Sequence, residues 1–239
     1  PAARKKVYIM DKRKKYILML DTETANGHTS SNGKVDLQDS LVYDIGVAIV
    51  DKQGSVYATK SFVISEIFLD HENLMDSAYY ADKILIYGKD ILRGTRTVRT
   101  IWQARKEILA LCAEWNCTTV CAHNARFDYR SLNNTVRYIS GSACRYFFPK
   151  QFVWWDTLLM CYDTYYKQKS YRRFCEKYNY QTKHKTPRPQ LKAEVLYRYL
   201  SGDNIFTENH TGLEDVLIEC VILKQCLRQH KKMRKCLFK

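Results

Sequence analysis

The sequence has no run of about 18 consecutive apolar residues, the length that a membrane span requires. Its N-terminus is basic and lacks the apolar core of a secretion signal. Nine cysteines are present, but none forms a CxxC pair, and the spacing of Cys112, Cys117, Cys121 and His123 matches no usual structural zinc pattern. We therefore expect a soluble, cytoplasmic protein with buried, reduced cysteines.

Acidic residues are scarce relative to basic ones. Lysine and arginine number 39 against 25 aspartates and glutamates, a formal net charge of +14. Such an excess attracts polyanions and speeds their encounter, so nucleic acid is the leading partner. On charge alone, a ribosomal-type binder or a protein of anionic membrane surfaces stays open.

The length of 239 residues favours one substantial domain, and a hydrophobic content of 46% excludes a mostly disordered chain. There is no internal repeat. We predict a basic N-terminal extension at 1–15, a single domain at 16–228 and a basic C-terminal tail at 229–239.

Short apolar segments bounded by polar residues predict five strands, at 16–20, 41–50, 55–64, 119–122 and 152–155. A turn with Gly54 joins the second and third into a hairpin. Residues 24–40 are rich in turn formers and predict an exposed loop. Apolar spacing predicts a helix at 97–115 and further helices after Asp156, with loops at 181–190 and 201–209. This order favours an α/β fold.

Aromatic and cationic residues alternate between Cys161 and Lys192. Such a surface can stack bases and contact phosphates. The same pattern is typical of an amphipathic helix with core tyrosines and long cationic side chains that reach solvent. Both interpretations stay open at this point.

Two carboxylates, in Asp21-Thr22-Glu23, follow the first apolar strand at positions i and i+2, so strand periodicity places them on one face. Their repulsion is relieved by a cation, and magnesium and manganese prefer oxygen ligands. A pair of exposed acids at a strand end is the alternative.

Two further acids lie at suitable places. Asp128 follows the fourth predicted strand, with Phe127 as a packing anchor, and Asp215 lies in the first turns of the last predicted helix. His210 precedes that helix on a predicted loop, where an imidazole with a pKa of about 6.5 suits proton transfer. Each residue alone is also explained as a surface acid, a helix-start acid or a structural histidine.

Together, the three segments resemble the motifs of the DEDD exonuclease superfamily, in particular its histidine branch (DEDDh). That branch includes the DNA polymerase III epsilon-type proofreaders and RNase T, and the resemblance is greatest to stand-alone bacterial and phage members. It runs from Leu18 to about Cys220. Its motifs are DxETT/A at Asp21–Ala25, HNxxFD at His123–Asp128, and H followed by four residues and D at His210–Asp215.

The resemblance implies an RNase H-like fold, which we expect as a mixed five-stranded sheet flanked by helices. It implies that four acids hold two divalent metal ions, Mg²⁺ or Mn²⁺, and that His210 deprotonates the attacking water. Those acids are Asp21, Glu23, Asp128 and Asp215. The residues expected to bind substrate are Thr22, Thr24, Ala25, Asn124 and Phe127. Asp156 matches a frequent family position of structural or supporting character.

The implied activity is 3′→5′ exonucleolytic hydrolysis of DNA to nucleoside 5′-monophosphates, with single-stranded 3′ ends as the expected substrate. A polymerase or replication partner stays open. The alternatives are an exoribonuclease of the same fold, since a 2′-hydroxyl is read by few contacts, and a noncatalytic nucleic-acid-binding module.

Two features depart from the family pattern or compete with it. Asn26 stands where glycine is frequent, and a polar loop follows it. Tyr199 and Asp203 match the YxxxD spacing of the superfamily's tyrosine branch. We disfavour that assignment because Gly202 and Asn204 predict a helix end, whereas the third-motif acid projects from within a helix.

Overall fold

The computed structural model describes residues 10–26, 40–70, 72–76, 78, 82 and 84–238. Most of the predicted loop at 24–40, and most of the predicted N-terminal extension, lie outside these residues. At the edges of that loop the prediction is wrong, because residues 24–26 continue the first strand and Ser40 begins the second.

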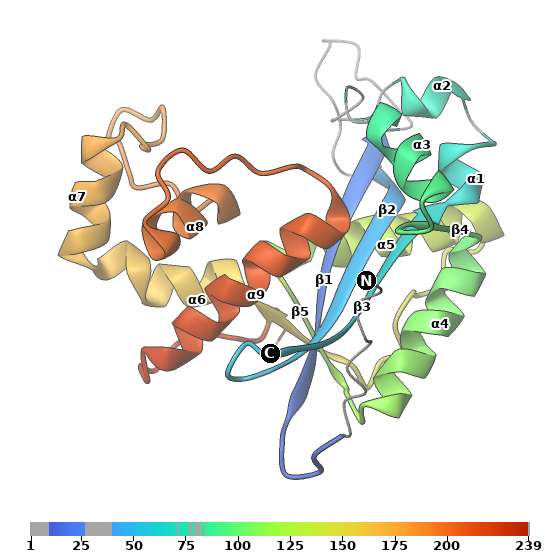
Figure 1. The fold of residues 1–239 in the computed structure, drawn as a ribbon, viewed down its shortest axis with the longest axis horizontal. Helices are drawn as coiled ribbons and strands as arrows, with labels where there is room; N and C mark the ends of the chain where they lie inside the picture. The colour runs from blue at the N-terminus through green and yellow to red at the C-terminus, as the bar shows by residue number, and fades with distance from the viewer. Residues whose placement is uncertain are drawn as a thin grey trace, which may run out of the picture.

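The described residues form a six-stranded mixed sheet in the order β4-β3-β2-β1-β5-β6 (Figure 1). β2 pairs antiparallel with β1 and β3, whereas the β1–β5, β5–β6 and β3–β4 pairs are parallel. The strands are β1 (Tyr16–Asn26), β2 (Ser40–Asp51), β3 (Val56–Ile64), β4 (Thr97–Arg99), β5 (Thr119–Ala122) and β6 (Val153–Asp156).

The predicted α/β fold is confirmed, but the prediction of five strands is wrong. The additional strand is β4, which the apolar spacing had assigned to the start of a helix. That helix begins only at Ile101, because Thr100 forms a capping box with Gln103. Three residues of β4 pair with the edge of β3, a tertiary interaction that local periodicity does not encode.

Helices cover both faces of the sheet (Figure 1). Along β1, Leu18 and Leu20 face the core that includes residues of the helices before β6, whereas Ile17 and Met19 face the core shared with the helices after it. The first group comprises α1 (Ser65–Phe68), α2 (Glu72–Met75), α3 (Ile84–Leu92), α4 (Ile101–Glu114) and α5 (Ala125–Ser140); the second comprises α6 (Thr157–Asp163), the 3₁₀ helix η3 (Tyr165–Lys167), α7 (Lys169–Lys177), α8 (Ala193–Ser201) and α9 (Gly212–Arg228).

The tyrosines of the aromatic and cationic segment pack against each other. Tyr171 is fully buried, and its ring lies 5.0 Å from that of Tyr199 on α8. Cations such as Lys183 and Lys185 are exposed. This arrangement agrees with the second interpretation of the segment, in which the tyrosines pack in the core and the cationic side chains reach solvent.

All nine cysteines are free thiols, and seven are buried, as predicted; Cys144 and Cys236 are exposed. Within the described residues, no helix combines the length and apolar character that crossing a bilayer requires.

Candidate metal centre and active site

Three carboxylates meet where β1 passes under the start of α9. One oxygen each of Asp21, Glu23 and Asp215 lies within 4.8 Å of the other two. Asp21 and Glu23 share a face of β1, and Asp215 stands in the first turn of α9. The fold therefore brings Asp215 next to two acids that lie more than 190 positions earlier in the sequence, and the three form a group that suits a divalent cation.

Two glycines allow α9 to approach the sheet this closely. A Cβ on Gly46 of β2 would lie 2.1 Å from the backbone of Gly212, and a Cβ on Gly212 would lie 2.7 Å from the backbone nitrogen of Gly46. Gly46 is also the cross-strand partner of Asp21. The close contact therefore sets the first turn of α9, with Asp215, directly over the acidic part of β1.

A buried ion pair fixes the same helix start. Asp44 of β2 is completely buried, and its Oδ2 accepts hydrogen bonds from the Gly212 backbone N–H at 2.9 Å and the Tyr87 hydroxyl at 2.8 Å. Arg96 contacts the same oxygen at 2.8 Å and reaches Glu214 of α9 at 2.9 Å. β2 and α9 are thus joined by charge as well as by backbone contact.

Asp128 lies beside the three-carboxylate group, not within it. It is buried in the first turn of α5, and its Oδ1 accepts a hydrogen bond from the Thr22 hydroxyl at 2.9 Å. Its negative charge contributes to raising the pKa of Asp21. Thr22, predicted to bind substrate, is therefore engaged by a predicted metal ligand.

The pKa values of these acids are raised because they are buried next to each other. Burial raises the pKa of Glu23 to about 9 and of Asp215 to about 8, and in each case nearby carboxylates add to the shift. Burial likewise raises the pKa of Asp21, with Glu219 as the largest contributing neighbour. Burial raises the pKa of Asp128 to about 7, although the hydrogen bond from Thr22 acts in the opposite direction.

The site fits a divalent cation. Asp215 Oδ1 is buried and has no hydrogen-bond partner among the described residues. An unpaired buried carboxylate oxygen, on a residue whose carboxylate lies beside two others, has the chemistry of a metal ligand. A cation would also offset the repulsion that raises the pKa values.

Glu219 was not predicted from the sequence. It lies one turn after Asp215 on α9, is buried, and accepts a hydrogen bond from the backbone N–H of His123 at 3.2 Å. It thereby links α9 to the end of β5, just before the helix that carries Asp128. The sequence does contain a sign of this role: Glu219 is a charged residue at i+4 from Asp215, on the side of the predicted helix that is otherwise apolar.

His210 adopts a left-handed backbone conformation, with φ of 53°, two residues before α9. Its side chain is 27% exposed, and Nδ1 lies 3.8 Å from a carboxylate oxygen of Glu208. Burial raises the pKa of Glu208 to about 7. The histidine is thus partly accessible and has an acid beside it.

The other predicted substrate-binding residues surround the same strand ends. Thr24 and Ala25 are buried in β1 just after Glu23. Asn124 is exposed in the left-handed conformation that precedes α5, and Phe127 is partly buried in the first turn of that helix.

Asp156 and His123 are held in structural hydrogen bonds. Asp156 caps α6 by accepting from the Leu158 N–H at 2.8 Å and also accepts from the Asn124 N–H at 3.1 Å. The partly buried ring of His123 contacts the Thr157 hydroxyl and the Leu191 carbonyl at 2.8 and 2.7 Å. These bonds fix the turn that leads into α5.

The competing tyrosine-branch pair is not at this centre. Tyr199 bonds to Ser170 at 2.8 Å, and Gly202 ends α8 in a left-handed conformation, as predicted. Asp203 lies beyond the helix, is exposed, and accepts from the backbone of Ile205. The acid that projects from within a helix is Asp215.

No family model and no curated protein matches the sequence. Among solved structures, the chain is similar to the nuclease domain of 3'hExo, described as a DEDDh family member bound to rAMP. The TM-score is 0.59 at 15% sequence identity, and the match covers 94% of this chain and 98% of the other. The chain therefore has the fold of a DEDDh-family nuclease domain, as the motif resemblance predicted.

Proposed function

We propose that this protein is a metal-dependent 3′→5′ exonuclease that hydrolyses terminal phosphodiesters of DNA to nucleoside 5′-monophosphates. The observation that carries the proposal is the grouping of Asp21, Glu23 and Asp215 within 4.8 Å, in the fold of a DEDDh nuclease domain. Asp128, bonded to Thr22 beside them, is the fourth acid.

The four carboxylates would hold two divalent cations, Mg²⁺ or Mn²⁺, which, when bound, lower the pKa of water and stabilise charge on the leaving oxygen. Asp215 has a buried oxygen without a hydrogen-bond partner among the described residues, and it lies on a helix whose start is held by Asp44 and Arg96. Because these groups are fixed before substrate arrives, little reorganisation is needed during the reaction.

His210 would act as the general base. Its partial exposure leaves the ring accessible to water and substrate, and Glu208 lies 3.8 Å from its Nδ1. A neighbouring carboxylate stabilises the imidazolium that forms when the ring takes a proton. Glu208 would in this way support proton uptake without contacting the substrate.

A second candidate is an exoribonuclease of the same fold. One observation favours it: the similar nuclease domain is described as bound to rAMP, a ribonucleotide. The noncatalytic module has less support, because all four acids and the histidine of the motifs are present and three of the acids form one group.

The test is digestion of single-stranded DNA, duplex DNA and RNA, each labelled at the 3′ or the 5′ end, with magnesium or with chelator. We expect magnesium-dependent release of mononucleotides from the 3′ end, with DNA degraded faster than RNA. Faster degradation of RNA would select the exoribonuclease.

Asp21→Asn provides the site control, with an expected loss of about 10³-fold in turnover, equivalent to about 4 kcal/mol. Asp203→Asn is the matched control, because it removes an exposed acid outside the centre, and it should leave turnover unchanged. Full activity in Asp21→Asn would refute the proposal.

A further inference from the structure

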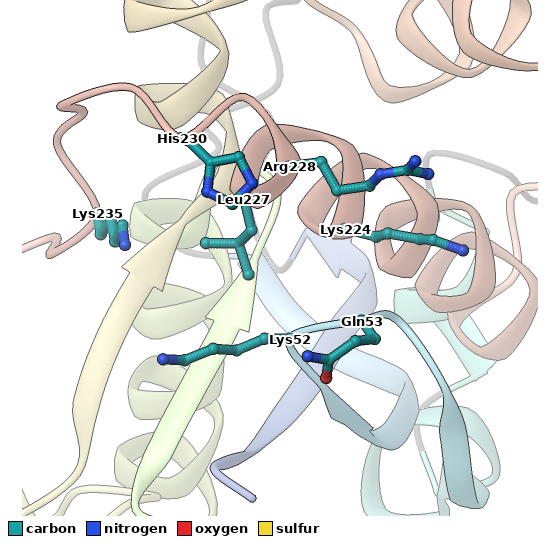
Figure 2. A pocket seen from close by; sticks show the side chains of 7 residues that line it. All are labelled: Lys52, Gln53, Lys224, Leu227, Arg228, His230 and Lys235. Carbon is teal, nitrogen blue, oxygen red and sulfur yellow. The ribbon is translucent and has the colours of Figure 1, made fainter.

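A basic pocket lies at the C-terminal end of α9 (Figure 2), whereas the acidic group lies at the start of this helix. It has a volume of about 660 Å³ and is lined by cationic side chains from three parts of the chain. Lys52 comes from the turn between β2 and β3, Lys224 and Arg228 come from the last turns of α9, and Lys235 comes from the C-terminal segment, with His230 nearby.

The walls of this pocket are held by close packing of the β2–β3 turn against α9 and by a backbone hydrogen bond from the C-terminal segment to β6. Gly54, in the β2–β3 turn, has φ of +76°, and a Cβ there would lie 2.8 Å from the Cβ of Lys224. The C-terminal segment pairs with the edge of β6, since the Lys235 carbonyl accepts from the Asp156 N–H at 2.8 Å. The cations are therefore presented by a preformed structure.

Among the described residues that line the pocket, none carries a carboxylate side chain. The nearest acid in the turn, Asp51, is buried and pairs with Lys14 at 2.8 Å. In the part of the chain that the structure describes, no salt bridge involves Lys52, Lys224 or Arg228. Cations at the end of α9 suit the helix dipole, but this does not account for Lys52, which belongs to another element.

An outward stripe of α9 runs from the pocket to the start of the helix, on the face of the helix opposite Asp215. Leu217, Val221, Lys224 and Arg228 follow each other at intervals of four, three and four residues, so they share one face of the helix. All four are exposed or partly exposed, and none is acidic. From Asp215 to Arg228 the helix rises about 20 Å, the length of about six stacked nucleotides.

We propose that the basic pocket binds the phosphate backbone of a nucleic-acid strand whose 3′ end lies at the acidic group, about six nucleotides away. The inference rests on the proposed exonuclease function and adds to it a minimum substrate length for full affinity. The cations of the pocket contact phosphates of this strand.

The test compares Lys52→Glu/Arg228→Glu with Lys89→Glu/Lys106→Glu, which reverses two exposed lysines on α3 and α4. Binding of oligothymidylates of three and twenty nucleotides is measured by fluorescence anisotropy in chelator, at several salt concentrations. Hydrolysis of both is measured with magnesium.

For the pocket variant, we expect at least a tenfold loss of 20-mer affinity and a slope of log K against log salt that is less steep by about 1.4, as for two lost phosphate contacts. On the 20-mer, KM should rise and kcat stay constant, with trimer hydrolysis unchanged. The Lys89→Glu/Lys106→Glu variant should behave as wild type within about threefold.

Three results would overturn the proposal: unchanged 20-mer affinity in the pocket variant, an equal loss in the α3/α4 variant, or an equal loss on the trimer. Unchanged 20-mer affinity together with lost binding to phosphatidylserine vesicles would assign the pocket to a membrane surface instead. Absence of hydrolysis of either oligonucleotide by wild type would refute the exonuclease, while the binding measurement would still decide on the pocket.

Discussion

The two ends of α9 carry opposite charge in opposite environments. At its start, Asp215 is buried against Asp21 and Glu23, and the pKa of each is raised. At its end, Lys224 is partly exposed, Arg228 is exposed, and both line the basic pocket. Exposed cations cost little to maintain, whereas buried like charges destabilise the fold unless a ligand compensates them.

The two ends therefore differ in what explains their charges. The buried acids at the start of α9 do not stabilise the fold, because apolar residues at the same positions would stabilise it more. Buried groups with shifted pKa values are typical of functional sites. A functional interpretation of the basic end is supported by its place on the same helix and by the absence of carboxylates among the described residues that line the pocket. One helix would thus hold metals at its start and a polyanion at its end.

The largest effect is expected at His210. Replacing it with alanine should lower kcat by about 10²–10⁴-fold, since a general base contributes about that much. His210→Asn is the better folding control, because asparagine tolerates the left-handed backbone found there. Tyr199→Phe should leave kcat unchanged; loss of turnover in Tyr199→Phe with full activity in His210→Ala would assign the reaction to the tyrosine-branch pair.

The next largest effect concerns the charge pair that holds the start of α9. Arg96→Ala leaves Asp44 buried without its cation and should lower the free energy of unfolding by about 3–5 kcal/mol, measured in urea. Arg93→Ala, which removes an exposed arginine nearby, should change it by less than about 0.5 kcal/mol. In Asp44→Asn/Arg96→Ala, the loss should be smaller than the sum of the single losses; strict additivity would contradict a direct pairing.

The acidic end should make metal-free protein less stable as pH rises. Glu23 and Asp215 have folded-state pKa values of about 9 and about 8, above the ordinary value of an unfolded chain. The stability that these two groups contribute is therefore complete below pH about 4 and is lost as the pH rises toward 9. Over that range, the free energy of unfolding falls by about 1 kcal/mol per pH unit for each group that is protonated in the native state but not in the unfolded state.

The check is the melting temperature in chelator at pH 5.5, 7.0 and 8.5. We expect a steady fall, a shallower fall in Asp21→Asn, and little fall with saturating Mn²⁺, because the metal replaces the protons. A melting temperature that rises with pH in chelator would contradict the assignment of these pKa values.

The smallest effect separates two roles of Thr22. Its hydroxyl donates a hydrogen bond to Asp128, and Thr22→Val removes this bond, which is worth about 1 kcal/mol. We expect the loss to appear as weaker Mn²⁺ binding and a several-fold lower kcat. Thr22→Ser keeps the donor and should restore both. A raised KM with unchanged Mn²⁺ affinity would instead show that Thr22 contacts the substrate.

Residues that lie close in sequence were the ones that the sequence revealed best. Asp21 and Glu23 are recognisable because strand periodicity and a short motif act together, and Asp215 stands at a predictable helix start. Asp44, Arg96 and Glu219 were not predicted, because their roles depend on partners on distant elements. An aspartate within the apolar segment 41–50 was the visible sign of such a partner.

The secondary structure also divides into elements that local sequence predicts and elements that depend on distant partners. Strands of four or more apolar residues and the helix end at Gly202 follow from local chemistry. β4 does not, because three residues carry no period of their own and are ordered by pairing with β3. Its position matters for the site, since Arg96 directly precedes it.

The proposed exonuclease activity depends most on the acidic group being a metal site. Titration of metal-free protein with Mn²⁺, followed by electron paramagnetic resonance, tests this directly in wild type, Asp21→Asn and Asp203→Asn. We predict two bound Mn²⁺ ions per chain in wild type and Asp203→Asn, and loss of at least one, with weaker affinity for the other, in Asp21→Asn. Equal Mn²⁺ binding by all three proteins would contradict the account.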